Sequence, residues 1–391
     1  MICNSQEKIS KLTGKEFFKP KGVRDLQVVF QDLADKASSK KVVLVGGTNG
    51  KGETCFSLEW CAKKAGLKPA MFTSPHLFSI HERFRFDGKN IDEIELRNLL
   101  KAFDEKYPSN KCDLSYFELC FWLFLSFVEI KSPDLIICEV GLGGRLDITN
   151  LLEPSVAIVT NISRDHTELL GNTYKKILFE KLGITREGVP LFTGLSTDYL
   201  KNEVKVFAEK KGFSVCFIEP HKHYSHSNKL MAKKVFETVF NKSSRNIPFD
   251  SLFEENVDPR IKDFNHCEDR KIVFFGAHNL DGHRSLIKSL GARRGFSFIF
   301  LSFSNRKISE IKSILKCYLE WTDLKIPIYL NGLPFFKSCD LVKLESALVD
   351  LGVTYLKILK CKIELKKILK NQKTCLWTGS YYSCELFDEL F

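Results

Sequence analysis

The sequence predicts a two-domain α/β fold, in which a P-loop-type parallel-sheet domain is followed by a smaller Rossmann-like α/β domain. Three observations predict it. A short β-branched run breaks into a glycine-rich loop that leads into a helical pattern. Further buried-strand runs alternate with helical segments, as in a parallel sheet that is covered by helices on both faces. The chain has 391 residues, which is more than a single compact core usually contains.

The first domain opens with a predicted strand at Lys41–Val45, a loop at Gly46–Gly52 and a helix over Thr54–Ala65 that ends at Gly66. Strand, glycine turn and helix are the opening of a βαβ unit. Further strands of this domain are predicted at Lys68–Phe72, Asp134–Cys138 and Val156–Thr160.

A second strand-rich series follows the polar stretch Glu254–Arg260. Its strands are predicted at Lys271–Phe275, Phe296–Leu301, Ile326–Leu330 and Thr374–Trp377. The sequence therefore predicts a first domain over residues 1–254, a linker over 255–270 and a second domain over 271–391.

Composition excludes several classes of protein. With 44% apolar and 27% charged residues, the chain resembles an ordinary globular protein. Its most apolar run, Leu119–Val128, is half of the roughly 20 residues that a membrane span needs. The first residues lack the pattern of a signal peptide. We expect a cytoplasmic protein with no membrane partner.

Charge and cysteine spacing exclude two further classes. The net charge is +11, but the lysines are scattered, whereas a nucleic-acid binder concentrates them on one helix or tail. We expect no nucleic-acid partner. No two of the 13 cysteines lie within five residues of each other, so the spacing indicates reduced thiols in the cytosol and no metal knuckle.

The loop Gly46–Gly52 is the strongest local signal for chemistry. Glycines let backbone N–H groups close around phosphate oxygens, and the start of the following helix adds its positive end. Lys51 would then reach the β- and γ-phosphates. Val45 replaces the first glycine of a strict Walker A sequence, and Gly52 replaces its Ser/Thr. The pattern favours a nucleotide site over a mere tight turn.

Polar side chains that could hold magnesium follow three of the predicted strands. Ser74 follows the strand that ends at Phe72, Glu139 closes the next strand, and His166 follows Val156–Thr160. Ligands gather at the carboxyl ends of parallel strands, so these three residues are expected to converge. A hydroxyl, a carboxylate and an imidazole make a magnesium shell only when phosphates and water complete it.

These motifs resemble the folylpolyglutamate synthase and dihydrofolate synthase family, which belongs with the Mur-type amide ligases. The resemblance rests on motifs that run in order over roughly residues 20–280. They are Gly47–Gly52, Thr73–Leu77, Glu82-Arg83, Asp87-Gly88, Glu139–Asp147, Thr149-Asn150, Asp165-His166, Leu170-Gly171 and Glu180–Ile184, with Gly379–Tyr381 near the end.

The resemblance implies an ATP-dependent ligase that adds L-glutamate to dihydropteroate, to reduced folates or to both, through an acyl phosphate. It implies a monomer whose active site lies between the two domains. The implied ATP-binding residues are Thr48, Asn49, Gly50, Lys51, Gly52, Asn228 and Arg260. The implied magnesium ligands are Ser74, Glu139, His166 and Lys181, where Lys181 matches a lysine that is N-carbamylated in the family.

The remaining site residues are also carried over from the resemblance. Lys51, Lys181 and His278 are expected to be catalytic, and closure of the second domain is expected to bring His278 toward the phosphates. The implied substrate-binding residues are Tyr116, Phe117, Glu118, Leu119, Leu146, Asp147 and Ile148.

Four departures from the family pattern are visible. Glu53 replaces the serine of the phosphate loop, so its carboxylate has to turn away or pair with a cation. Pro259 replaces the glycine before Arg260, and Phe275 replaces a nucleotide-binding aspartate. Ser304-Asn305-Arg306 stands where the family often has Asp-Lys-Asp.

Two rival interpretations stay open. One is a Mur-type ligase that acts on a peptidoglycan precursor. The other is a catalytically weakened ligase homologue that acts as a binding protein, because Glu53, Pro259 and Phe275 depart from the pattern. The presence of Lys51, Glu139, His166 and Lys181 argues against the second, because a decayed site has no physical reason to keep all of them.

Overall fold

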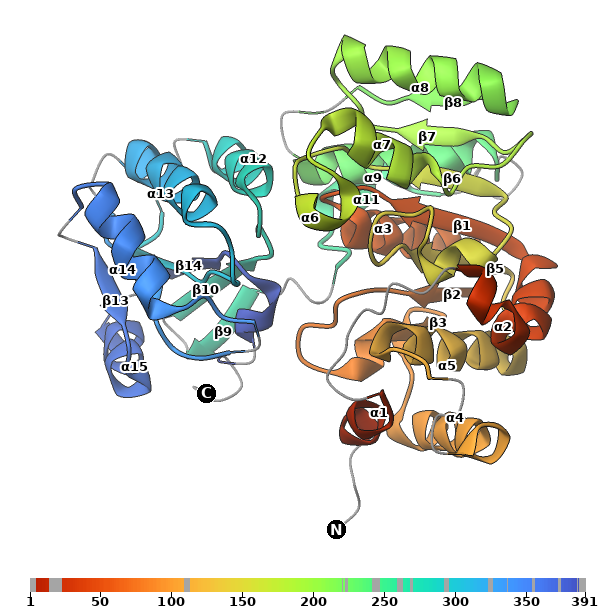
Figure 1. The fold of residues 1–391 in the computed structure, drawn as a ribbon, viewed down its shortest axis with the longest axis horizontal. Coiled ribbons are helices and arrows are strands. Elements are labelled where there is room, and N and C mark those ends of the chain that lie inside the picture. Colours follow the sequence, from red (N-terminus) through yellow and green to blue (C-terminus); the bar gives the residue numbers. More distant parts are fainter. Residues whose placement is uncertain are drawn as a thin grey trace. The chain divides into compact units, whose positions relative to one another are not determined.

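The computed structural model describes residues 5–13, 23–108, 113–219, 221, 224–240, 247–258, 263–267, 270–291, 295–322, 326–335, 337–353, 356–371, 374–384 and 386. The chain divides into two compact units. Unit 1 contains residues 1–221 and 225–257, and unit 2 contains residues 258–391 with 222–224. Each unit is built on one sheet of its own (Figure 1).

Unit 1 is built on an eight-stranded sheet in the order β4-β3-β2-β5-β1-β6-β7-β8. The central strands are parallel, and β3 and β4 add an antiparallel edge beside β2. The strands are β1 Lys41–Gly46, β2 Pro69–Phe72, β3 Phe84–Phe86, β4 Lys89–Asn90, β5 Leu135–Glu139, β6 Val156–Val159, β7 Leu191–Thr193 and β8 Val215–Phe217.

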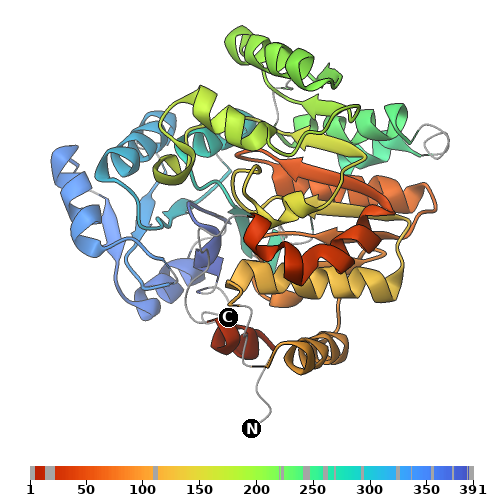
Figure 2. The same ribbon diagram turned by 45° about the vertical axis from the view of Figure 1, so that its right-hand side comes forward.

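Helices cover both faces of this sheet (Figure 2). The helices of unit 1 are α1 Ser5–Thr13, α2 Val23–Ser38, α3 Lys51–Lys64, α4 Glu93–Lys106, α5 Tyr116–Lys131, α6 Thr167–Leu170, α7 Tyr174–Leu182, α8 Asp198–Lys211, α9 Tyr224–Thr238 and α11 Phe249–Glu254. The 3₁₀ turns η1 Ile80–Arg83 and η3 Ile148–Leu151 lie in loops of its described part.

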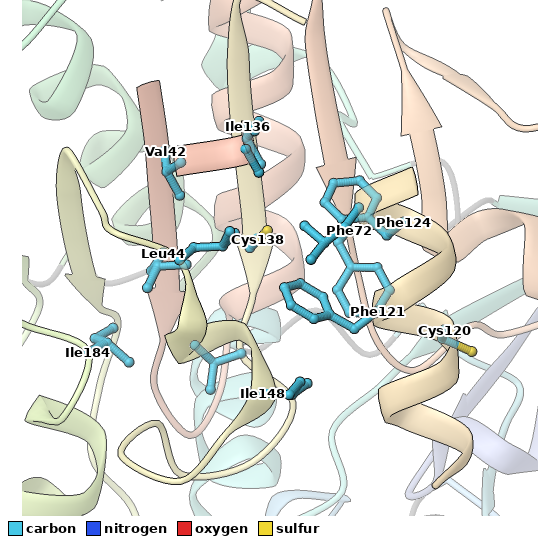
Figure 3. Packing of buried hydrophobic residues seen from close by; sticks show 14 of the residues in the cluster. Val42, Leu44, Phe72, Cys120, Phe121, Phe124, Ile136, Cys138, Ile148 and Ile184 are labelled. Atoms are coloured by element: carbon cyan, nitrogen blue, oxygen red, sulfur yellow. The ribbon is translucent and has the colours of Figure 1, made fainter. Parts of the chain in front are cut away.

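Successive strand residues point to opposite faces, and this alternation divides the core in two. Val42 and Leu44 pack with helices α2 and α5 on one face, whereas Val43 and Val45 pack with α3 and α9 on the other. Both faces of the strands are apolar because both are covered, as the continuous β-branched runs predict. Figure 3 shows the first face, where residues of β1, β2 and β5 meet α5.

The apolar run Leu119–Val128 lies in α5, a buried core helix. A capping box starts this helix, because Ser115 and Glu118 each bond the other's backbone N–H. Phe121 and Phe124 then contact Phe72 of β2, with ring centroids 5.6 and 5.2 Å apart (Figure 3). Among the residues that the structure describes, no helix is long and apolar enough to span a membrane.

Unit 2 contains a six-stranded sheet in the order β13-β12-β11-β14-β10-β9, parallel except for β9. Its strands are β9 Asp263–Cys267, β10 Arg270–Phe275, β11 Phe298–Leu301, β12 Ile328–Asn331, β13 Lys357–Leu359 and β14 Thr374–Thr378. Its helices are α12 Leu280–Leu290, α13 Ile308–Thr322, α14 Leu341–Asp350 and α15 Lys362–Asn371, with the 3₁₀ turn η4 Tyr381–Cys384.

The predicted fold class is confirmed, with corrections to single elements. Six of the described strands were not predicted, because each is only two to five residues long and gives too short a pattern to recognise; they are β3, β4, β7, β8, β9 and β13. The helix after the glycine loop begins at Lys51 and not at Thr54. The left-handed Gly50, with φ 81°, ends the loop there, so Lys51 is the first residue of α3.

A buried ion pair connects the antiparallel edge of the unit 1 sheet to α3. The side chains of Glu59 and Arg85 are only 6% and 8% exposed, and Arg85 Nη2 lies 2.9 Å from Glu59 Oε2. Arg85 also donates to Asn90 Oδ1 and to the Gly88 carbonyl. Nearly all donors of this guanidinium therefore serve to hold β3 and β4 in place.

We predict that Glu59→Ala lowers the free energy of unfolding of unit 1 by about 3 kcal/mol, because it leaves a buried guanidinium charge without its partner. Urea titration followed by circular dichroism measures the change. Asp32→Ala breaks the exposed Lys36 pair and serves as the control, for which we expect no measurable change. Equal effects of the two variants would contradict the role of the buried pair.

Candidate active site

The predicted phosphate loop lies at the carboxyl end of β1, between β5 and β6. The segment after β6 braces it: Thr48 N donates to Asn161 O at 3.0 Å, and Asn49 N donates to Asn161 Oδ1 at 2.9 Å. Thr160 Oγ1 donates to the Asn49 carbonyl at 2.7 Å. The first N–H groups of α3 begin directly after this braced loop and have no acceptor within the helix. These hydrogen bonds preorganise the loop backbone, and its N–H groups with those of α3 are suited to bind an anion.

Two lysine side chains meet at one carbonyl of this loop. Lys51 Nζ lies 3.3 Å from the carbonyl oxygens of both Gly47 and Thr48. Lys181 Nζ comes from the far end of α7 and donates to the same Gly47 oxygen at 2.8 Å. Lys181 is only 4% exposed. An amine contributed by a distant helix is therefore buried beside the phosphate loop.

Burial changes the acid–base chemistry of Lys181. It lowers the pKa of this amine from 10.5 to about 7, and the positive charge of Lys51 acts in the same direction. Asp165 and Asp147 act in the opposite direction but do not compensate. Near neutral pH a large fraction of the Lys181 side chain is therefore the uncharged amine, which is nucleophilic.

Close backbone contact holds the end of α7 in place. A Cβ at Gly183 would collide with the backbone of Arg145, so only glycine allows this approach. Arg145 donates from two nitrogens to the Glu180 carboxylate, at 2.9–3.2 Å. The Asn150 amide donates to the carbonyls of both Arg145 and Gly183 at 3.1 Å. These contacts fix the turn that carries Lys181 against the loop after β5.

The structure brings two of the predicted metal ligands together. Ser74 follows β2 and Glu139 ends the neighbouring strand β5, and Ser74 N donates to Glu139 Oε2 at 3.0 Å. Glu139 is 4% exposed. Hydroxyl and carboxylate oxygens are donors that suit magnesium, so the chemistry of this pair fits the ion.

His166 lies beyond β6, in the left-handed conformation with φ 49°, where its N–H donates to Asp165 Oδ1. The carboxyl ends of β2, β5 and β6 thus carry the three residues that were predicted to converge, and β1, which carries the glycine loop, lies between β5 and β6. Within the described part of the chain, no group of three or more His, Cys, Asp or Glu side chains is arranged to hold a metal. A bound ion would therefore need the phosphates as ligands.

Most side chains of the predicted substrate segment at the start of α5 are buried or cap the helix. Leu119 is fully buried, and Glu118 caps the helix by accepting from Ser115 N at 2.7 Å. Tyr116 is 3% exposed, burial raises the pKa of its hydroxyl, and the Arg83 guanidinium lies over its ring. Phe117 is only partly buried, which leaves it the accessible side chain of this segment.

The second predicted substrate segment is divided in the same way. Leu146 is 49% exposed, whereas Ile148 is 4% exposed and belongs to the core cluster (Figure 3). Asp147 is buried, which raises its pKa, and it accepts from Leu142 N, Thr149 N and the Thr149 hydroxyl. Its carboxylate organises the loop, and a role of these residues in substrate binding stays a prediction.

The other predicted site residues differ in their distance from the phosphate loop. Asn228 is in the first turns of α9, beside Gly50 of the loop. Arg260 and Pro259 lie outside the described residues. His278 is in unit 2, where its Nδ1 lies 3.0 Å from the Gly276 carbonyl and its ring faces Tyr381 at 5.4 Å. The catalytic role of His278 stays a prediction.

Sequence reasoning missed the residues that brace the site. Asn161 lies just beyond the strand Val156–Val159, so its place at a strand end was a usable signal. Asn150 and Arg145 lie within a motif that was recognised, but their contacts with α7 depend on tertiary structure. No local pattern indicates such a long-range contact.

We predict that Lys181→Met has a higher free energy of unfolding than wild type at low pH, and that this difference shrinks as the pH rises. Below pH 7 the native state has to hold a buried charge, which costs wild type on the order of 5 kcal/mol relative to the variant. Between pH 7 and 10.5 the unfolded state binds more protons than the native state, so wild-type stability rises with pH and the difference shrinks.

Urea titrations of both proteins from pH 6 to 9.5, without bicarbonate, measure this difference. The control is Lys176→Met, which removes an exposed lysine of the same helix. A stability difference between wild type and Lys181→Met that does not depend on pH would contradict the buried neutral amine.

Comparison with known proteins gives partial sequence matches and a fold match along the chain. No profile of a known protein family matches it. It is 39% identical over 183 residues to a dihydrofolate synthase/folylpolyglutamate synthase of Haemophilus influenzae, which is 46% of this chain and 41% of that relative. It is 44% identical over 162 residues to the protein of the same name from Buchnera aphidicola, 41% of this chain and 37% of the relative.

The chain thus spans less than half the length of these curated relatives. A crystal structure of a bifunctional folylpolyglutamate synthase/dihydrofolate synthase with Mn, AMPPNP and L-glutamate bound matches with a TM-score of 0.81. That match covers 100% of this chain and 98% of the other, at 22% identity. The resemblance that the motifs predict is confirmed: the chain is homologous over part of its sequence to dihydrofolate synthase/folylpolyglutamate synthases, and it has their fold.

Proposed function

We propose that the chain is an ATP-dependent ligase that adds L-glutamate to dihydropteroate, to a reduced folate or to both. The observation that carries the proposal is the pair of lysine amines at the Gly47 carbonyl of the phosphate loop. The names of the relatives and the AMPPNP and L-glutamate of the similar structure support the choice of substrates. ATP and a divalent cation are the implied cofactors.

The proposed reaction has two steps. An oxygen of the acceptor carboxylate attacks the γ-phosphorus of ATP, the bond to ADP breaks, and an acyl phosphate forms. The amine of L-glutamate then attacks the acyl carbon, phosphate leaves, and the amine loses its proton. Two anions have to approach each other in the first step, so cationic groups at the loop are needed to lower the barrier.

Lys51 is suited to shield the phosphates, because it lies at the first turn of α3 with its amine over the loop. Ser74 and Glu139 would hold magnesium together with His166 and the phosphates. Bound magnesium would supply charge neutralisation at the transferred phosphoryl group. The braced backbone at Asn49 would orient the phosphates without reorganisation.

Lys181 is proposed to be N-carbamylated. Its uncharged amine is the form that attacks carbon dioxide, and the nitrogen then loses a proton to give an anionic carbamate. The lowered pKa of the amine makes that form available near neutral pH. The carbamate oxygens would add negative charge beside Lys51 and provide oxygen ligands for a second magnesium.

We predict product with L-glutamate and ATP from dihydropteroate and from a reduced folate, each offered separately and analysed by mass. Lys51→Ala should fold normally and lose at least about 100-fold in turnover, because Lys51 supplies charge at the phosphates and no core packing. The circular dichroism spectrum of this variant is the control for its fold.

Other outcomes would change the proposed activity. Product from only the reduced folate would indicate a folylpolyglutamate synthase, and product from only dihydropteroate would indicate a dihydrofolate synthase. Product from a peptidoglycan precursor instead would favour the Mur-type alternative. ATP turnover that stays absent with every acceptor at saturation would contradict the ligase proposal and favour a binding protein.

A further inference from the structure

The carboxylate of Glu53 has a fixed place between two helices. It stands in the first turn of α3, and it accepts hydrogen bonds from Ser225 Oγ and Asn228 Nδ2, both near the start of α9. The second of these bonds is 2.7 Å long. Burial lowers the pKa of Lys229, and the nearby negative charges of Glu53 and Glu255 act in the opposite direction without compensating. Glu53 therefore turns from the phosphate loop toward α9.

The Asn228 side chain lies against the phosphate loop. Asn228 is 5% exposed, and a Cβ at Gly50 would lie 2.5 Å from its Oδ1, 2.7 Å from its Nδ2 and 2.9 Å from its Cγ. Because Oδ1 and Nδ2 are both nearer than Cγ, the amide points its polar edge toward Gly50. Within the described part of the chain, the hydrogen bond of this amide goes to Glu53.

An asparagine amide can present either a donor or an acceptor to a ligand, depending on how it is turned. A carboxylate only accepts hydrogen bonds, so Glu53 requires the NH₂ group of Asn228 on its side. The carbonyl oxygen Oδ1 is then the atom that is left to meet a ligand above Gly50. An oxygen in that place repels phosphate and needs a hydrogen-bond donor.

We propose that Glu53 is a specificity-determining positioning residue: by fixing the Asn228 amide, it makes the site select a nucleotide whose nucleoside part donates a hydrogen bond to Asn228 Oδ1. The inference rests on the proposed function in that it takes the ligand of the loop to be a nucleotide. The donor is either the exocyclic amine of the base or a hydroxyl of the ribose. Comparing the affinities for three nucleoside diphosphates distinguishes these two donors.

The test is the affinity of the purified chain for ADP, IDP and 2′-deoxy-ADP with magnesium, by isothermal titration calorimetry. IDP has a carbonyl in place of the base amine, and 2′-deoxy-ADP lacks one ribose hydroxyl. Wild type should bind ADP about tenfold more tightly than the analogue that lacks the donor. Weaker IDP identifies the base amine, and weaker 2′-deoxy-ADP identifies the ribose.

Glu53→Gln should reduce this preference to within about twofold, because a glutamine amide can accept from or donate to Asn228 and no longer fixes it. Adding Asn228→Asp to Glu53→Gln should restore the preference. In that double variant the introduced glutamine donates to one oxygen of the introduced aspartate, and the other oxygen faces the ligand. Ser225→Ala, the matched control, removes a different hydrogen bond of Glu53 and should keep the wild-type preference.

Two results would overturn the inference. One is a wild type that binds all three diphosphates equally. The other is a preference that Glu53→Gln leaves unchanged or that Ser225→Ala lowers equally, because looser packing of α9 would then explain it. Binding of a nucleoside diphosphate does not require the carboxylate substrate of the ligase. If the variants change the nucleotide preference as expected but no ligase product forms, only the proposed function is refuted. Absence of all ADP binding would refute both.

Discussion

The hydrogen bond from Lys181 to the Gly47 carbonyl is the contact on which the rest of the site depends. Removing a lysine amine from water is costly, and here a second lysine lies on the same carbonyl. The amine therefore loses its proton readily, with a pKa of about 7. Burial thereby makes the Lys181 side chain an uncharged, nucleophilic amine beside the phosphate loop near neutral pH.

The sheet order of unit 1 makes this contact possible. Four adjacent parallel strands end at one edge, so Ser74, Glu139, the glycine loop and Asn161 reach the same place from distant parts of the chain. The loop after β5 then holds α7 through backbone contact at Gly183. The polar residues of the site rest on a core that is apolar on both faces of the sheet, which keeps the strand ends in register.

Much of this arrangement could be predicted from the sequence, for physical reasons. The strand Lys41–Gly46 and its loop carry a local signal, since a β-branched run followed by glycines allows few conformations. Placing Ser74 and Glu139 together needed only the rule that ligands gather at the carboxyl ends of parallel strands. The contact of Lys181 joins residues 134 apart in sequence, so the local pattern alone indicates an exposed lysine. Glu53 could be recognised as a departure, but its partners on α9 could not, because they come together only in the folded chain.

The central claim is that the buried amine of Lys181 takes up carbon dioxide. The most direct measurement is the ¹³C NMR spectrum of wild type and of Lys181→Met in ¹³C-bicarbonate near neutral pH, with ADP and magnesium. The account predicts one protein-bound carbamate resonance in wild type that is absent from the variant. A wild-type spectrum without that resonance, or the same resonance in both proteins, would contradict it.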